Sequence, residues 1–104
     1  METNISELKL KHIAKKYLSF FTSYSFLNYP SIKSYFPNFN LNFLSHVELA
    51  FQSLSSPLKL IINNDFFYQD YPGWWKKIYT WSEYQSLKRK AIKTFMENYY
   101  AINN

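Results

Sequence analysis

The sequence predicts an all-α protein, a small bundle of four to five helices that ends in a helix-turn-helix. The chain has 104 residues, enough for one domain and too few for two cores of ordinary size. Apolar residues make up 47% and aromatic residues 22%, which indicates a packed core. Gly73 is the single glycine, and a turn-rich β-sandwich or barrel would need more. We therefore expect one domain over residues 1–104, with N-terminal helices and an irregular loop in 1–53 and the helix-turn-helix-like half in 54–100.

The first helix is expected over residues 4–21, because apolar residues recur there at helical spacing and lysines fill much of the remainder. Its apolar stripe consists of Leu10, Ile13, Ala14, Tyr17, Leu18 and Phe21. Residues 23–40 contain two prolines and several Asn and Ser, so they predict an irregular connection with one short turn near 31–35. The aromatic residues expected to fold back onto the core from this connection are Phe26, Tyr29, Tyr35, Phe36 and Phe39.

Two further helices are expected before the glycine. The first covers residues 41–54, with Asn40 or Asn42 as its N-cap. Its apolar stripe consists of Leu44, Val47, Phe51 and Leu54. The second has Ser56 as N-cap and Pro57 at the first helical position, where the missing N–H costs nothing, and continues through residues 58–66. Residues 68–73 form a turn that ends at Pro72-Gly73.

A short helix over residues 74–79 and a long last helix are expected to complete the chain. The last helix begins at Ser82 and reaches residue 99 or 100, and Ser82 and Gln85 fit the capping-box pattern. Glu83 in its first turn suits the positive end of the helix dipole. The side expected to pack consists of Tyr84, Leu87, Ala91, Phe95 and Asn98 or Tyr99, whereas Gln85, Ser86, Arg89 and Lys93 project from the other side.

The positive charge of the chain is concentrated in one segment. The net charge is +5, and residues 74–93 hold six basic residues against the single acid Glu83, so the remaining residues are neutral together. This segment is a short helix, a tight turn and a capped helix, preceded by the helix at 58–66. That order is the layout of a helix-turn-helix with an exposed basic second helix. A cationic outer face that is merely solvated is the alternative explanation.

The predicted partner of this basic segment is double-stranded DNA. Lysine and arginine contacts release counterions from a duplex, and an α-helix fits its major groove. Gln85, Ser86 and Arg89 are expected to approach bases, because their side chains can read base edges. The lysines expected to contact phosphates are Lys76, Lys77, Lys90 and Lys93.

Residues 79–95 resemble the C-terminal motif of the small phage late-gene transcriptional activators of Firmicutes, the ArpU type, which are related in layout to the C-terminal domain of bacterial sigma factors. The family pattern is approximately Tyr-Ser-x-Ser-Thr-Tyr-Tyr-Arg-Leu-Lys-x-Lys-Ala-x-x-x-Phe. The matching residues are Tyr79, Ser82, Tyr84, Leu87, Lys88, Lys90, Ala91 and Phe95. The pair Trp74-Trp75 and the stretch 54–58 are also similar to the family. The resemblance implies a sigma-like helix-turn-helix that regulates transcription.

The resemblance covers residues 54–99 and departs from the family pattern at the start of the last helix. Glu83, Gln85 and Ser86 stand where the pattern has Thr, Tyr and Arg, so the resemblance implies no base preference. Residues 1–53 carry no motif that resembles this or another family.

Enzymatic chemistry has no candidate residues in this sequence. Cysteine is absent, which excludes thiolate catalysis and Cys-based zinc sites, and one glycine cannot build a phosphate loop. His12 and His46 lack carboxylate or histidine partners at metal-ligand spacing. Asp65 and Asp70 are better explained by helix capping and turn formation than by acid–base catalysis. We therefore expect no enzyme activity, no cofactor and no metal.

Alternative partners follow from the same residues. An adaptor that binds RNA polymerase or another acidic protein surface would also use a basic face. The six aromatic residues around the turn, Trp74, Trp75, Trp81, Tyr68, Tyr71 and Tyr79, could stack single-stranded bases, although a wedge between two helices is the simpler use. The expected location is the cytoplasm, since no signal peptide or membrane-spanning stretch is present and the apolar face of the first helix is better explained by core packing than by membrane binding.

Overall fold

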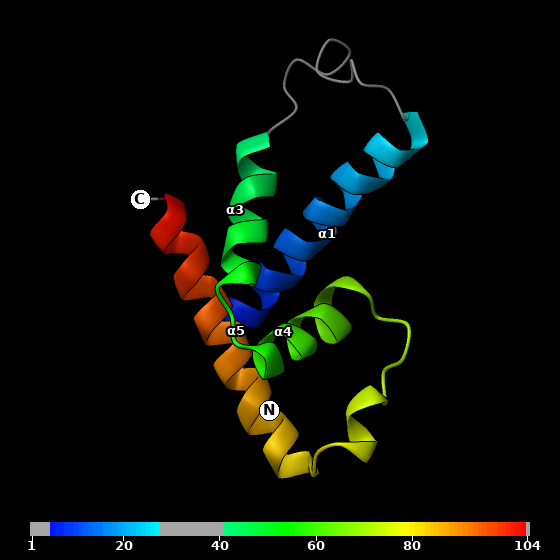
Figure 1. Ribbon diagram of the computed structural model, residues 1–104, viewed down its shortest axis with the longest axis vertical. Coiled ribbons are helices and arrows are strands. Elements are labelled where there is room, and N and C mark those ends of the chain that lie inside the picture. Colours follow the sequence, from blue (N-terminus) through cyan, green and yellow to red (C-terminus); the bar gives the residue numbers. More distant parts are fainter. Residues whose placement is uncertain (1–4, 28–40, 104) are drawn as a thin grey trace.

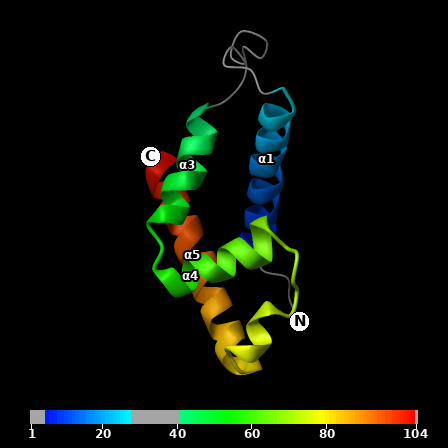
Figure 2. The same cartoon turned by 45° about the vertical axis from the view of Figure 1, so that its right-hand side comes forward.

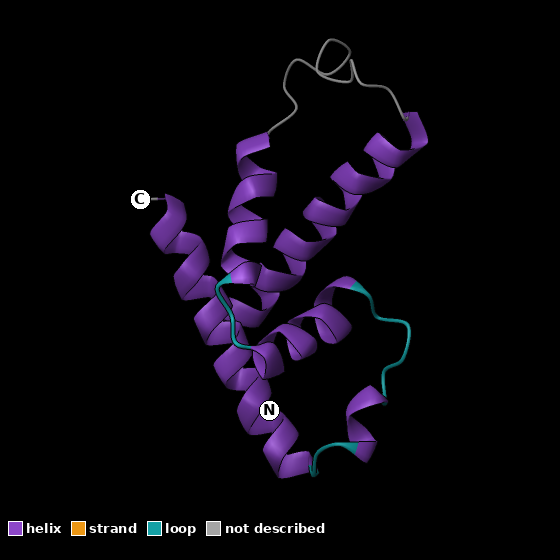
Figure 3. Ribbon diagram, in the orientation of Figure 1, coloured by secondary structure: helices purple, strands orange, loops and turns teal. Residues whose placement is uncertain are grey.

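The computed structural model describes residues 5–27 and 41–103, and every regular element in these two ranges is a helix (Figure 3). The α-helices are α1 (Ile5–Leu27), α3 (Leu41–Gln52), α4 (Ser56–Ile62) and α5 (Trp81–Asn103). A short π-helix, η1 (Asn63–Phe67), continues α4, and a 3₁₀ helix, η2 (Trp74–Lys77), precedes α5. The predicted all-α class, a small helical bundle, is confirmed.

Helices α1, α3 and α4 pack around α5. Helix α5 contacts each of these three helices, and η1 contacts α1. Helices α1 and α3 run in opposite directions beside each other, and α4 crosses in front of α5 (Figures 1 and 2). One side of α5 is therefore packed in the core, and α5 cannot move away without exposing that core.

The core is apolar and is contributed by every α-helix. Leu10, Ile61, Ile62, Ala50 and Phe95 are fully buried at its centre. The other residues that the structure describes as buried are Ile13, Ala14, Phe43, Val47, Leu54, Leu58, Phe66, Phe67, Tyr84, Ala91, Ile92 and Met96. Burial of this much apolar surface is the main favourable term that holds the helices together.

The N-terminal elements differ from their predicted bounds at their ends. Helix α1 reaches Leu27, six residues beyond the predicted end at 21, because Ser23 and its neighbours continue the helix and the first proline comes only at Pro30. Helix α3 ends at Gln52 rather than at Leu54. The predicted turn at 31–35 and the five aromatic side chains of the irregular connection lie outside the part of the chain that the structure describes.

Helix α4 begins and ends differently from the prediction. Its N-cap is Ser55, not Ser56, and Ser55 makes no side-chain capping bond. Pro57 is therefore the second residue of the helix and not the first, and it still lies in the first turn, where its missing N–H costs nothing. The helix changes into the π-helix η1 at Asn63, where the N–H of Tyr68 donates to the carbonyl of Asn63 at 2.7 Å. The last two residues of this π-helix, Phe66 and Phe67, are both buried in the core.

Candidate nucleic-acid interface

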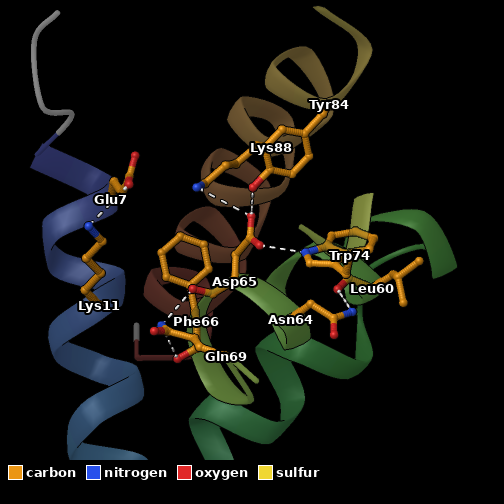
Figure 4. A network of polar contacts seen from close by, with 10 residues as sticks. All are labelled: Glu7, Lys11, Leu60, Asn64, Asp65, Phe66, Gln69, Trp74, Tyr84 and Lys88. Atoms are coloured by element: carbon orange, nitrogen blue, oxygen red, sulfur yellow. Dashed lines mark hydrogen bonds and ion pairs between the residues drawn. The ribbon is translucent and has the colours of Figure 1, made fainter. Parts of the chain in front are cut away.

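The segment that carries the positive charge is held to the core by Asp65, in η1 (Figure 4). The Nε1–H of Trp74 donates to Oδ1 of Asp65 at 2.8 Å, and the hydroxyl of Tyr84 donates to Oδ2. The ammonium of Lys88 lies 3.4 Å from the same Oδ2. The Asp65 side chain is 7% exposed, so these contacts join η1, η2 and α5 in a largely dehydrated place.

The network corrects two expectations about charged residues. Asp65 is more than a cap or turn residue, because it receives two side-chain hydrogen bonds and an ion pair. Lys88 counts toward the predicted positive segment, but its side chain is 23% exposed and its ammonium also lies 5.7 Å from the ring centroids of Phe66 and Tyr84. Lys88 is therefore part of the packed side of α5.

The tryptophans beside the network pack against one another and against Tyr84. The rings of Trp75 and Tyr84 are stacked, 4.5 Å apart and 6° from parallel, and Trp81 lies 5.5 Å from Trp75. Trp74 meets the rings of Tyr84 and Tyr79 edge-on, at 6.2 and 6.5 Å. These five residues form the wedge that the sequence predicts as the simpler use of the cluster.

Two of the predicted cluster members lie outside the wedge. Tyr68 is 58% exposed and Tyr71 is 75% exposed, and within the described ranges no ring contact joins either of them to the wedge. They precede η2 in a connection without regular structure, so nothing directs their rings toward α5. Trp81 remains 59% exposed although one side of it touches Trp75 and Tyr84.

A capping box starts α5, two residues before the predicted one. The N–H of Glu83 donates to Oγ1 of Thr80 at 3.2 Å, and the N–H of Thr80 donates to Oε1 of Glu83 at 2.8 Å. The predicted box of Ser82 and Gln85 is wrong, because α5 begins at Trp81 and Ser82 is already helical. The hydrogen bonds from the backbone and side chain of Thr80 lower the pKa of Glu83, which stabilises the cap in its ionised form.

The exposed side of α5 carries four of the predicted contact residues. Ser86, Arg89, Lys90 and Lys93 are all exposed, and their spacing of three and four residues places them on one face of the helix. Gln85 is only half-exposed, because it lies at the edge of the packed side. Helix α5 thus presents Arg89, Lys90 and Lys93 together, and none of them makes an ion pair with the described residues; we call Ser86, Arg89, Lys90 and Lys93 the basic face.

Lys76 and Lys77 lie outside the basic face, because η2 packs through Trp74 and Trp75 on Tyr84, on the opposite side of α5. They end η2, both are exposed, and only residues 78–80 separate them from α5. The short helix is a 3₁₀ helix over residues 74–77 and not the predicted helix over 74–79. Its end is marked by the N–H groups of Ile78 and Tyr79, which both donate to the carbonyl of Trp75. Of the seven predicted contact residues, six are exposed and Gln85 is half-exposed.

Other chemistry finds no assembled site in residues 5–27 and 41–103. No three His, Asp or Glu side chains converge there as metal ligands would. His12 is exposed on α1 and His46 is half-buried on α3. No helix in the described ranges has the length and apolar character to cross a membrane.

The role of Asp65 in building this site was missed, as was that of Thr80 in the cap, and for Asp65 a weak signal exists in the sequence. It is the one acid inside an apolar run from Leu58 to Phe67 that is otherwise interrupted only by a lysine and two asparagines. An acid in such a run needs a partner when it is buried.

Comparison of the chain with protein-family models, curated proteins and solved structures found no match.

Proposed function

We propose that this chain binds double-stranded DNA through the basic face of α5 and regulates transcription. The observation that carries the proposal is the basic face itself, where three cationic side chains lie exposed without ion-pair partners among the described residues. A surface of this kind attracts a phosphate backbone, because each contact releases counterions.

The roles of the individual residues follow from their positions. Ser86 and Arg89 lie in the second and third turns of α5. In a recognition helix, the residues near the N-terminal end are the ones that contact base edges in the major groove. Lys90 and Lys93 lie on the same face and suit phosphates, as do Lys76 and Lys77 at the end of η2. Gln85 is half-exposed, so it would read bases only from the edge of this surface.

The rigidity of the surroundings also supports the proposal. The capping box fixes where α5 starts, and the Asp65 network joins η1 and η2 to α5. Side chains that read bases lose less entropy when the helix that carries them is already fixed. The resemblance of residues 79–95 to the phage activators points to the same use and to a role in transcription.

The test is a salt titration of binding to a mixed-sequence duplex, followed by fluorescence anisotropy. We expect the affinity to fall as salt rises. Arg89→Gln with Lys93→Gln is expected to weaken binding about tenfold and to lower the salt slope by about 1 for each phosphate that these side chains neutralise in the parent chain. The matched control, Lys11→Gln with Lys15→Gln, removes the same charge from exposed positions of α1 and is expected to bind nearly as the parent chain does.

Two results would overturn the proposal. One is an affinity that does not change with salt, and the other is equal weakening by the α5 and α1 pairs, which would mean that only net charge matters. Preferential binding of a single strand would instead indicate the tryptophans. The stacked and hydrogen-bonded rings of Trp75 and Trp74 argue against that use.

A second candidate is an adaptor that binds an acidic protein surface, such as one on RNA polymerase. The observation in its favour is the pair Ile78 and Trp81, which are 57% and 59% exposed next to Lys76 and Lys77. Aromatic and apolar side chains with a cationic rim are typical of protein interfaces. Binding to purified polymerase that persists after nuclease treatment and is abolished in Trp81→Ala would favour the adaptor.

A further inference from the structure

We propose that a cavity on the side of α3 binds a small organic cation with an apolar body, such as an arylalkylamine. The cavity measures about 560 Å³ and lies among α1, α3 and η1. This volume falls within the range of small-molecule sites. None of the residues that line it belongs to the basic face, so the inference does not rest on the proposed function.

Three elements build the walls of the cavity. Helix α1 supplies Tyr17, and the segment after α4 supplies Asn63, Phe67 and Tyr68. Helix α3 supplies a continuous side of its last two turns, since positions spaced three and four apart face the same way. The α3 residues that line the cavity are Ser45, Val47, Glu48, Leu49, Phe51 and Gln52.

The charge that would select the ligand is that of Glu48, the one charged side chain among the described residues that line the cavity. The hydroxyl of Tyr17 donates to Oε2 of Glu48 at 2.9 Å, which fixes the carboxylate at the wall. Its other oxygen, Oε1, makes no hydrogen bond with the described residues, and Glu48 is exposed, so an ammonium group can approach the carboxylate. Burial and the hydrogen bond to Glu48 raise the pKa of Tyr17 above its ordinary value, so its hydroxyl stays a donor into alkaline pH.

The aromatic rings of the walls suit the same class of ligand. The rings of Tyr17 and Phe51 meet Phe67 edge-on, at 5.5 and 6.5 Å between centroids. Rings around a carboxylate favour a cation, because their π-faces and the carboxylate attract the same charge. They also bury the apolar body of the ligand.

One lysine lies beside the cavity and is held by two of the residues that line it. The ammonium of Lys59 donates to Oε1 of Gln52 at 3.3 Å and lies 6.0 Å from the centroid of Phe51. Lys59 does not line the cavity. An anionic ligand would have to recruit this lysine and approach Glu48 at the same time, so the cavity disfavours anions.

The experiment is calorimetric titration of the full chain with three probes of similar shape: 2-phenylethylamine, neutral 2-phenylethanol and anionic 3-phenylpropionate. We expect the amine to bind at one site per chain, about tenfold more tightly than the alcohol, with the propionate weakest. Glu48→Gln is expected to weaken binding of the amine about tenfold and to leave that of the alcohol within about twofold. Glu48 is exposed, so this variant keeps the fold.

Two further variants separate the cavity from general charge effects. Glu97→Gln removes an exposed carboxylate from α5, away from the cavity lining, and is expected to leave all three affinities unchanged. Ser45→Trp fills the cavity from an exposed position and is expected to weaken all three probes. Equal affinities for the three probes, tighter binding of the propionate, no effect of Glu48→Gln, or no binding of any probe would overturn the inference.

Discussion

Asp65 joins three side chains that are distant from it in the sequence, those of Trp74, Tyr84 and Lys88. Its partners Trp74 and Tyr84 lie 9 and 19 residues away in the sequence. Sequence periodicity reports only on neighbours within a few turns, so it could not predict that these residues meet. It did place Tyr84 on the packed side of its helix, which the structure confirms, because Tyr84 is 6% exposed.

The stability of the chain is expected to depend on the charge of Asp65. Asp65→Asn keeps the shape of the side chain but removes the charge opposite Lys88 and one strong acceptor. We expect the free energy of unfolding to fall by about 2 kcal/mol, because Lys88 is left partly buried without a counterion. Urea denaturation followed by circular dichroism measures this change. Asp70→Asn, at an exposed position, is the control, and similar midpoints for both variants would contradict the prediction.

A second prediction at the residue scale concerns alkaline pH. Burial and then the hydrogen bond to Asp65 raise the pKa of Tyr84 above its ordinary value of about 10. The folded chain thus holds this proton more tightly than the unfolded chain, so Tyr84 stabilises the fold below about pH 10 and its contribution falls as pH rises further. In Tyr84→Phe, the free energy of unfolding, measured by urea denaturation, is expected to fall less steeply with pH between about pH 9.5 and 11. An unchanged slope in that variant would contradict the assignment.

Among the elements, α5 was predicted by its period, but its capping box was not, and its end at Asn103 lies beyond the predicted residue 99 or 100. Its long 3.6-residue period is a strong signal, but residues 80–85 contain two overlapping capping-box patterns. Thr80 with Glu83 prevails over Ser82 with Gln85, because a carboxylate accepts a backbone N–H more strongly than an amide does and suits the helix dipole. The π-helix η1 was not predicted. It contains the buried Phe66 and Phe67, and packing between distant elements leaves no mark on local periodicity.

The position of the cap can be tested by a pair of substitutions. Thr80→Ala removes the acceptor for the N–H of Glu83 and is expected to lower the free energy of unfolding by about 1 kcal/mol. Ser82→Ala is the matched control, because Ser82 is exposed within the first turn, and it is expected to change stability by less than about 0.5 kcal/mol. Thermal denaturation of both variants gives the comparison. A larger destabilisation by Ser82→Ala than by Thr80→Ala would contradict this and indicate that Ser82 is the N-cap.

For the whole molecule, the sequence predicted the class and the side of α5 that faces outward, but not how the parts meet. Arg89, Lys90 and Lys93 are exposed as their helical positions predict. Gln85 lies closer to the core than predicted, because Ile92 and Met96 widen the buried side of α5. The cavity beside Glu48 was not predicted at all, since it forms only where α1, α3 and η1 come together.

The last prediction concerns cooperativity. Because α5 contacts α1, α3 and α4, we expect the chain to unfold as one unit. All three tryptophans lie between residues 74 and 81, so their fluorescence reports on one end of the molecule, whereas circular dichroism reports on every helix. Phe95→Ala, which empties a fully buried position, is expected to cost about 3–5 kcal/mol and to shift both signals to the same lower midpoint. Leu8→Ala, at a position 51% exposed, is the control and is expected to shift both signals far less. Midpoints that separate in the parent chain would show that the tryptophan wedge and the Asp65 network open before the core does.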